Sequence, residues 1–202
     1  MARPQPWLVP AVWTGGLVPA GVLAARAASG TLGANPIDAA LNALGLEALV
    51  FLVGCLACTP LQWLSGWTWP VRIRRVLGLL SLGYATAHFL VYVALDQALN
   101  VSLVLEDLGK RPFIAVGFAC FVLLIPLGLT STQGAVRRLG FVRWKRLHRL
   151  VYVCASLACF HYYLRVKKDV TQPLLYAAAV VALLSARAVA SRRGTRETTA
   201  KR

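Results

Sequence analysis

Six long apolar segments, separated by short polar or basic stretches, dominate the hydrophobic pattern of this chain. They are Trp7 to Ala28, Leu41 to Leu64, Val76 to Leu95, Pro112 to Thr130, Leu147 to Leu164 and Val170 to Val189. A membrane-spanning helix needs about 20 mostly apolar residues. The pattern therefore predicts an all-α, polytopic membrane helical bundle of about six transmembrane helices over residues 1–190, followed by a basic cytoplasmic tail at 191–202 that we expect to be disordered.

The first apolar segment is either a retained anchor or a cleaved leader. Ala25-Arg26-Ala27 is similar to a signal-peptidase site. However, the basic region before the segment consists of Arg3 alone, and Pro10 and Pro19 interrupt the apolar stretch. A cleaved leader normally has a basic start and an unbroken apolar centre. We therefore expect a retained anchor.

Composition and charge support a membrane protein without a separate large soluble domain. Of the 202 residues, 58% are hydrophobic and 14% are charged, and the mean hydropathy is +0.63. The net charge of +15 resides in short loops beside the apolar segments, which is typical of orientation in a bilayer rather than of nucleic-acid binding. If the N-terminus is cytoplasmic, 16 of the 22 lysines and arginines face inward. The positive-inside rule therefore predicts that both termini are cytoplasmic.

Two histidines lie deep inside the apolar segments, His88 in the third and His161 in the fifth. Ionisable side chains within a bilayer are functional candidates, and histidine is a common axial ligand of haem iron. Counted along helices, His88 lies about 20 Å from Arg75, and His161 lies about 21 Å from Leu147. Equal depth on two helices favours a haem held by His88 and His161 over two separately packed, hydrogen-bonded side chains.

His148 lies thirteen residues before His161, at the inner boundary of the fifth segment. In one continuous helix through both residues, the two imidazoles would lie about 20 Å apart along the helix axis. The depth of His148 excludes it from the iron between the other two histidines. It is a weaker candidate metal ligand, for a second haem, or an interfacial histidine beside Arg146 and Arg149.

Several other polar residues support weaker hypotheses. Arg74 and Arg75 are candidate cofactor-binding residues because guanidinium groups suit haem propionates and a flavin phosphate, although membrane topology alone also explains them. Glu47 could serve a proton or quinone site, but reaching the interface is the favoured interpretation. The five cysteines lie in apolar segments, so we expect them to pack as small hydrophobes; they are Cys55, Cys58, Cys120, Cys154 and Cys159.

The loop over residues 96–111 has mixed charge and lies on the outer side in the predicted orientation. We expect Glu106 and Asp107 to form an exposed acidic pair there. Such a pair suits the docking of a periplasmic partner, because complementary charge steers association. Ordinary solvation of a loop explains the same charges.

An ordered set of short motifs resembles the MsrQ (YedZ) family over residues 33–187. The motifs are Gly33-Ala34-Asn35-Pro36, Arg74-Arg75 with Leu77-Gly78-Leu79, His88-Phe89, Leu105-Glu106-Asp107 with Lys110-Arg111-Pro112, Leu129-Thr130-Ser131, and Trp144 with Leu147-His148-Arg149-Leu150-Val151-Tyr152. Members of this family are the haem-binding membrane subunits of the bacterial periplasmic methionine sulfoxide reductase system. They are similar to the ferric-reductase-like transmembrane proteins.

The resemblance implies a b-type cytochrome of the bacterial inner membrane, an electron-transfer subunit rather than a catalytic one. Electrons would pass from the quinone pool, or from a cytoplasmic flavin reductase, to the periplasmic molybdopterin enzyme MsrP, which repairs oxidised proteins. His88 and His161 match the haem-ligand positions of the family, and His148 matches its further candidate ligand. FMN is implied by the resemblance alone, because the sequence contains no phosphate-binding glycine loop.

The chain departs from the wider family, in which each of two helices carries two histidines thirteen or fourteen residues apart. Here the residues at those positions before His88 are Arg75 and Arg74. At most, His148 would hold a second haem together with some other group. Two rival functions remain, a cytochrome that reduces ferric ions or oxygen directly, and a small transporter or assembly protein without haem.

Overall fold

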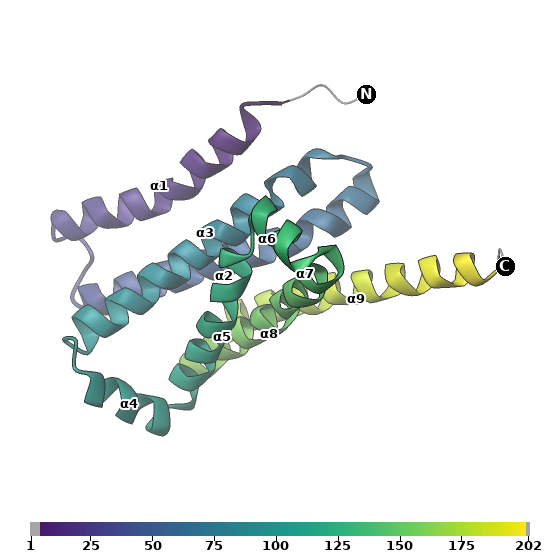
Figure 1. Ribbon diagram of the computed structural model, residues 1–202. Coiled ribbons are helices and arrows are strands. Elements are labelled where there is room, and N and C mark those ends of the chain that lie inside the picture. The colour runs from purple at the N-terminus through teal and green to yellow at the C-terminus, as the bar shows by residue number, and fades with distance from the viewer. Residues whose placement is uncertain (1–4, 201–202) are drawn as a thin grey trace.

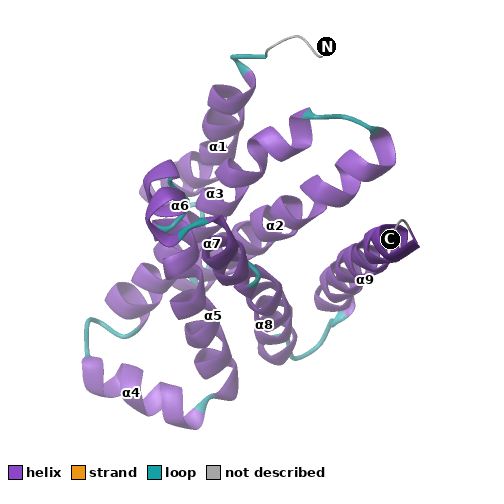
Figure 2. Ribbon diagram, turned by 45° about the vertical axis from the view of Figure 1, so that its right-hand side comes forward, coloured by secondary structure: helices purple, strands orange, loops and turns teal. Residues whose placement is uncertain are grey.

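The computed structural model describes residues 5–200, with side chains described as far as Ala190, and is helical without strands over that range. The elements follow one another along the chain as a bundle of long helices with short helices at its ends (Figures 1 and 2). They are α1 (Leu8–Ala28), α2 (Pro36–Ser65), α3 (Trp69–Val91), the π-helix η1 (Tyr92–Asp96), α4 (Val101–Lys110), α5 (Pro112–Leu129), α6 (Gln133–Leu139), α7 (Phe141–His148), α8 (Leu150–Arg165) and α9 (Thr171–Ala200). The expected all-α membrane bundle is confirmed.

Five of the six predicted spans correspond to helices that are long and apolar enough to cross a membrane, namely α1, α2, α3 with η1, α5 and α9. The remaining predicted span corresponds to α8, which has 16 residues. A helix of that length rises about 24 Å, somewhat less than the roughly 30 Å of a bilayer core. The disorder expected for 191–202 stays a prediction, because the side chains from 191 onward and residues 201–202 lie outside the described part.

The expectation that His148 and His161 share one helix is wrong, because the chain turns at Arg149 between α7 and α8. The N–H of Arg149 donates to the carbonyl of Arg146 at 3.1 Å, and the N–H of Tyr152 donates to the carbonyl of Arg149 at 3.0 Å. These three-residue steps tighten the chain into a 3₁₀ turn. His148 therefore ends α7 and does not share a helix with His161.

The hairpin of α2 and α3 forms the most extensive helix pair of the bundle (Figure 1). Asn35 caps α2 by accepting a hydrogen bond from the Asp38 N–H at 3.2 Å, and Pro36 occupies the first turn, where a missing N–H is tolerated. The helix ends at Gly66, whose φ of 71° suits glycine. The motif at residues 33–36 is thus the start of a helix.

The α5 and α8 helices pack against this hairpin and complete the surroundings of the candidate site. The main apolar core joins α2, α5, α8 and α9 through Leu52, Leu124, Ala155 and Val180, among others. The α1 helix is held to the outside of α3, because the Tyr84 hydroxyl donates to the Gly16 carbonyl at 2.7 Å. Helices α2, α3, α5 and α8 therefore enclose the interior, and α1 and α9 lie outside them.

Candidate haem site

Two imidazoles lie side by side in the interior in an edge-to-face arrangement, His88 from α3 and His161 from α8. Their ring centroids are 6.3 Å apart and their planes are inclined by 86°. A metal–imidazole bond of about 2.0–2.1 Å, plus roughly 1.2 Å from each nitrogen to its ring centre, gives about 6.4–6.6 Å between the centroids of two ligands on one metal. The observed separation is close to that value. The two histidines that the sequence placed at equal depth are thus brought together.

Both histidines are oriented by a backbone carbonyl of a neighbouring helix. Nδ1 of His88 lies 2.9 Å from the Leu41 carbonyl oxygen on α2, and Nδ1 of His161 lies 2.6 Å from the Phe113 carbonyl oxygen on α5. A carbonyl oxygen only accepts hydrogen bonds, so each Nδ1 carries the proton. Each Nε2 therefore keeps its lone pair, as a metal-ligating imidazole requires.

A glycine makes room for each imidazole. A Cβ atom at Gly45 would lie 3.1 Å from Nδ1 of His88, and one at Gly117 would lie 2.7 Å from Nδ1 of His161. Each glycine follows the accepting carbonyl by four residues, which is one helical turn. Sequence reasoning missed both glycines. Leu41 and Phe113 precede their histidines by 47 and 48 residues, but neither position can be recognised before the helices are packed.

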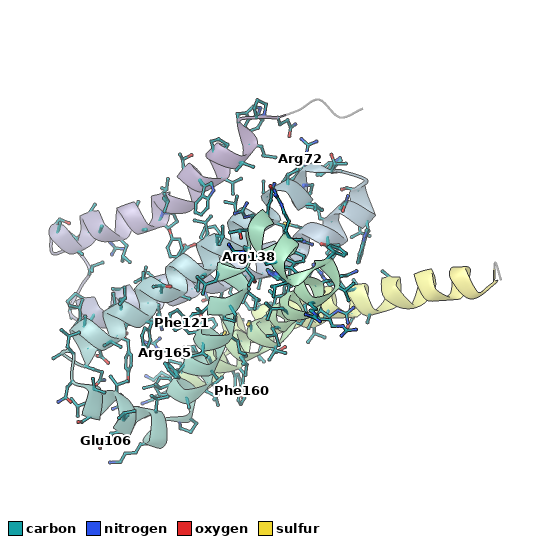
Figure 3. The ribbon with its side chains drawn as sticks, viewed as in Figure 1. Arg72, Glu106, Phe121, Arg138, Phe160 and Arg165 are labelled. Carbon is teal, nitrogen blue, oxygen red and sulfur yellow. The ribbon has the colours of Figure 1, made fainter. Side chains whose placement is uncertain are left out.

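A cavity of about 370 Å³ extends around the two imidazoles between α2, α3, α5 and α8. Phe89, Phe118 and Phe121 form an aromatic wall, with the rings of Phe89 and Phe121 stacked at 4.9 Å. Where α2 begins and α8 ends, the lining becomes hydrophilic, and we call this region the polar end; it consists of Asn35, Asp38, Asn42, Asp96, Arg111 and Arg165. Figure 3 shows Arg165 and Phe121 between the helices.

These residues fit a haem better than a bare metal ion. Among the described residues, no group of three or more histidine, cysteine or acidic side chains is arranged to hold a metal. Two imidazoles alone leave a metal ion short of ligands, whereas a porphyrin would itself supply four further nitrogens. The apolar walls match a macrocycle, and a volume of 370 Å³ lies within the usual range for cofactor pockets.

His148 lies apart from this pair and does not line the cavity. Its ring stacks on Trp144 at 4.1 Å, and its Nε2 lies 3.0 Å from Oγ1 of Thr130. The Thr130 hydroxyl already donates to the Pro126 carbonyl at 2.6 Å, so it accepts from His148. Burial and the nearby charge of Arg74 lower the pKa of His148. These contacts support an interfacial role, and a second haem at His148 stays a prediction.

The predicted pair Arg74 and Arg75 diverges in the structure. Arg74 is half-buried and donates to Oγ1 of Thr59 on α2 at 3.2 Å, whereas Arg75 is exposed. Neither lines the cavity, so no contact between them and the His88–His161 pair is present. Their cofactor-binding role stays a prediction.

Sequence reasoning missed the structural role of Arg187, which it only counted among the 16 inward-facing basic residues. Its guanidinium donates to the Leu56 carbonyl at 2.6 Å and to the Tyr152 hydroxyl at 3.1 Å. Its Nε atom is buried without a hydrogen-bond partner among the described residues. Leu56 lies one turn from Thr59 on α2, so Arg74 and Arg187 approach the same stretch of that helix.

The expectation that Glu106 and Asp107 form an exposed acidic pair is wrong for Asp107, which is buried. Its carboxylate is buried where α4 packs against the bundle, and it accepts hydrogen bonds from Arg111 Nε at 3.1 Å, the Tyr92 hydroxyl at 3.1 Å and Gln97 at 3.0 Å. Glu106, the neighbouring residue on α4, is exposed and pairs with Lys110. Successive helical residues point about 100° apart, which explains the difference.

The cysteines and Glu47 make no arrangement typical of a redox or metal site. All five thiols are free, and four are buried. Cys58 donates to the Gly54 carbonyl of its own helix at 3.2 Å, and Cys120 on α5 donates to the Cys154 carbonyl on α8 at 3.2 Å. Glu47 is half-buried on α2 and does not line the cavity. Packing therefore accounts for the thiols.

Comparison with known proteins identifies the family of this chain. Residues 39–159 match the family described as Ferric reductase like transmembrane component. The protein-methionine-sulfoxide reductase heme-binding subunit MsrQ of Deinococcus radiodurans is 50% identical over 187 residues, which cover 92% of each chain. The protein of the same name from Rhodospirillum rubrum is 46% identical over 90% of this chain and 83% of its own.

The corresponding MsrQ of Ralstonia nicotianae is 45% identical over 93% of this chain and 87% of its own. No solved structure matches. The similarity thus extends over nearly the whole length of the relatives as well as of this chain. The chain therefore belongs to the MsrQ family of ferric-reductase-like transmembrane proteins.

Proposed function

We propose that this chain is a membrane b-type cytochrome whose haem iron is ligated by His88 and His161. The observation that supports this most strongly is the pair of neighbouring imidazoles, whose ring centroids are 6.3 Å apart, each fixed by its Nδ1 so that Nε2 is free to bind iron. The relatives are named heme-binding subunits, in agreement with such a site. A bound haem would supply one-electron chemistry, while the protein supplies position and electrostatic tuning.

The surrounding residues suit electron transfer rather than reaction at the iron. His88 and His161 would both hold the haem iron, which would leave no ligand position for oxygen or a ferric ion. The Leu41 and Phe113 carbonyls fix the two rings, which limits their movement when charge changes. The phenylalanine wall gives the cavity an apolar side. These features favour an electron carrier over a direct ferric or oxygen reductase.

The proposed route runs from the quinone pool, or from a cytoplasmic flavin reductase, to a periplasmic molybdopterin methionine sulfoxide reductase, MsrP. Arg72 and Arg138 lie toward one end of the bundle and Glu106 lies at the other (Figure 3). By the positive-inside rule, the basic end faces the cytoplasm of a bacterial inner membrane. The first turn of α1 and the last turn of α9 both lie toward that basic end (Figure 1). Both termini would therefore be cytoplasmic. The polar end of the cavity would then face the periplasm.

At the cytoplasmic end, a second cofactor is a separate part of the proposal. The phosphate of an FMN would find cationic partners in Arg74 and Arg187, which approach the same stretch of α2 from α3 and α9. Guanidinium groups bind phosphate with two parallel hydrogen bonds. Arg75 would contribute long-range charge only, since it is exposed. Quinol would also bind at this cytoplasmic end, from the lipid.

The experiment that tests the route measures oxidation of the reduced protein in proteoliposomes. Quinol reduces the protein, and MsrP with methionine sulfoxide is then added on the outside. We expect rapid reoxidation only when both MsrP and methionine sulfoxide are present. Equally rapid reoxidation by ferric citrate or oxygen alone would contradict the proposal and support a direct reductase. Absence of a haem signal in protein expressed with ample haem would leave the transporter or assembly function.

A further inference from the structure

The cavity has a strong asymmetry that limits how a haem can enter it. Its deep part is lined by Leu49, Leu52 and Leu124. Ser81 is a hydrophilic side chain at that depth, and its hydroxyl already donates to the Ala48 carbonyl at 2.8 Å. Haem has an apolar edge and an edge with two propionate groups. A carboxylate placed in the deep part would be buried without a partner, which is strongly unfavourable.

The polar end, in contrast, presents two guanidinium groups to the cavity. Arg165 follows His161 by four residues, so it lies on the same face of α8, about 6 Å nearer the polar end. Arg111 stands two residues before Phe113, whose carbonyl orients His161. Arg165 thus lies on the helix that carries one proposed iron ligand, and Arg111 lies at the start of α5, the helix whose carbonyl orients that ligand.

Each guanidinium is already positioned by a carboxylate of the protein. Arg165 reaches from the end of α8 to the start of α2, where it donates to Asp38 and Asn42. Arg111 donates through Nε to Asp107 at 3.1 Å. A guanidinium has five N–H donors, so each arginine has donors left for another oxygen ligand. Asp38, Asn42 and Asp107 therefore hold the two arginines in place without exhausting their hydrogen bonds.

We propose that a haem bound between His88 and His161 is oriented with its propionates at the polar end, where Arg165 and Arg111 bind them. The assignment rests on the haem site proposed above. Arg165 is the principal partner because its side chain is 28% exposed, against 53% for Arg111. This orientation also places the propionate edge toward α4 and the proposed periplasmic face, on the side where electrons would leave.

The arginines have a measurable effect on the iron in this arrangement. A positive charge near the iron favours its reduced form, and pairing the propionates removes negative charge that would oppose reduction. We expect Arg165→Gln to shift the reduction equilibrium about tenfold toward the oxidised form, which is about 59 mV for a one-electron couple. The haem content per chain should remain near that of the unaltered protein, because both histidines remain.

The test compares Arg165→Gln, Arg165→Lys and a control, Lys167→Gln, in purified full-length protein. Lys167 is a nearby basic residue that is exposed and does not line the cavity. Redox titration gives the midpoint potential, and resonance Raman spectroscopy gives the propionate-bending band, which responds to hydrogen bonding of the propionates. We expect a lowered potential and a shifted band in Arg165→Gln, partial recovery in Arg165→Lys, and no change in Lys167→Gln.

A second comparison separates direct binding of propionates from a general effect of charge. Protein reconstituted with iron protoporphyrin IX dimethyl ester, which lacks propionate charge, should show a much smaller difference between Arg165→Gln and the unaltered protein. A potential and a Raman band in Arg165→Gln that match those of Lys167→Gln would overturn the assignment but leave the histidine ligation intact. If Arg165→Gln holds no haem, Arg165→Lys and Arg111→Gln provide the same comparison, and unchanged bands in both would likewise overturn it.

Discussion

The most specific consequence of the site geometry concerns Gly117, which lies against the imidazole of His161. In Gly117→Ala, the new methyl group would lie 2.7 Å from Nδ1 and 2.8 Å from Cε1 of that ring. Unstrained contacts between such atoms are about 3.5–4.0 Å, so the methyl would be roughly 1 Å too close. The ring cannot retreat without leaving the Phe113 carbonyl and the position proposed for the iron.

The expected loss of haem affinity follows from two contributions. Overpacking in a tight interior costs about 1–3 kcal/mol. Loss of the Nδ1 hydrogen bond costs about 0.5–1.5 kcal/mol. Together these imply about 1.5–4.5 kcal/mol, or a haem affinity weaker by about 10-fold to about 2,000-fold. In the haem-free protein the His161 ring can rotate away, and alanine is the better helix former by about 1 kcal/mol, so haem-free stability should not fall.

The assay is a titration of haem into haem-free protein, followed by absorbance, together with thermal unfolding of the haem-free form. Two glycines provide matched controls. A Cβ at Gly45 would lie 3.1 Å from His88 Nδ1, and one at Gly83 would have no atom within 4 Å. We therefore expect the largest loss of affinity in Gly117→Ala, a smaller loss in Gly45→Ala and none in Gly83→Ala. Equal affinities for the Gly117 and Gly83 variants would refute the reasoning.

Two further predictions separate the neighbouring acidic residues of α4. Asp107→Asn should lower the free energy of unfolding by about 1.5–3 kcal/mol, because the buried carboxylate accepts hydrogen bonds from Arg111, Tyr92 and Gln97. Thermal unfolding measures this loss, and an unchanged unfolding midpoint would contradict the prediction. Glu106→Lys should change stability by no more than about 0.5 kcal/mol, because the residue is exposed. It should instead slow electron delivery to MsrP without loss of haem, and an unchanged rate in the proteoliposome assay would remove Glu106 from the docking surface.

The spans and the depth of the histidines could be predicted from the sequence because both depend on local properties. Apolar length identifies a span, and the fixed rise per residue places His88 and His161 at one level. The pairing of the two rings follows once α3 and α8 are packed in the same bundle. The same counting placed His148 away from that level, but it assumed a continuous helix through Arg149, where the chain makes a 3₁₀ turn.

The supports of the site could not be predicted, because they depend on how each helix is rotated about its axis. The Leu41 carbonyl and Gly45 matter only because that side of α2 faces His88, and the apolar pattern of α2 is nearly uniform around the helix. Asp107 and Arg187 were misjudged for a related reason. Their sequence positions suggest solvent, but α4 and α9 turn these side chains toward the bundle.

The measurement that most directly tests the central claim is a reduced-minus-oxidised absorbance spectrum of the purified protein, with haem quantified per chain. The variants are His88→Ala and His161→Ala, with His148→Ala as the matched control from outside the cavity. We predict one b-type signal in the unaltered protein, its loss in the first two variants and its retention in the third. A full signal in His88→Ala or His161→Ala, or loss of the whole signal in His148→Ala alone, would contradict the proposed ligation.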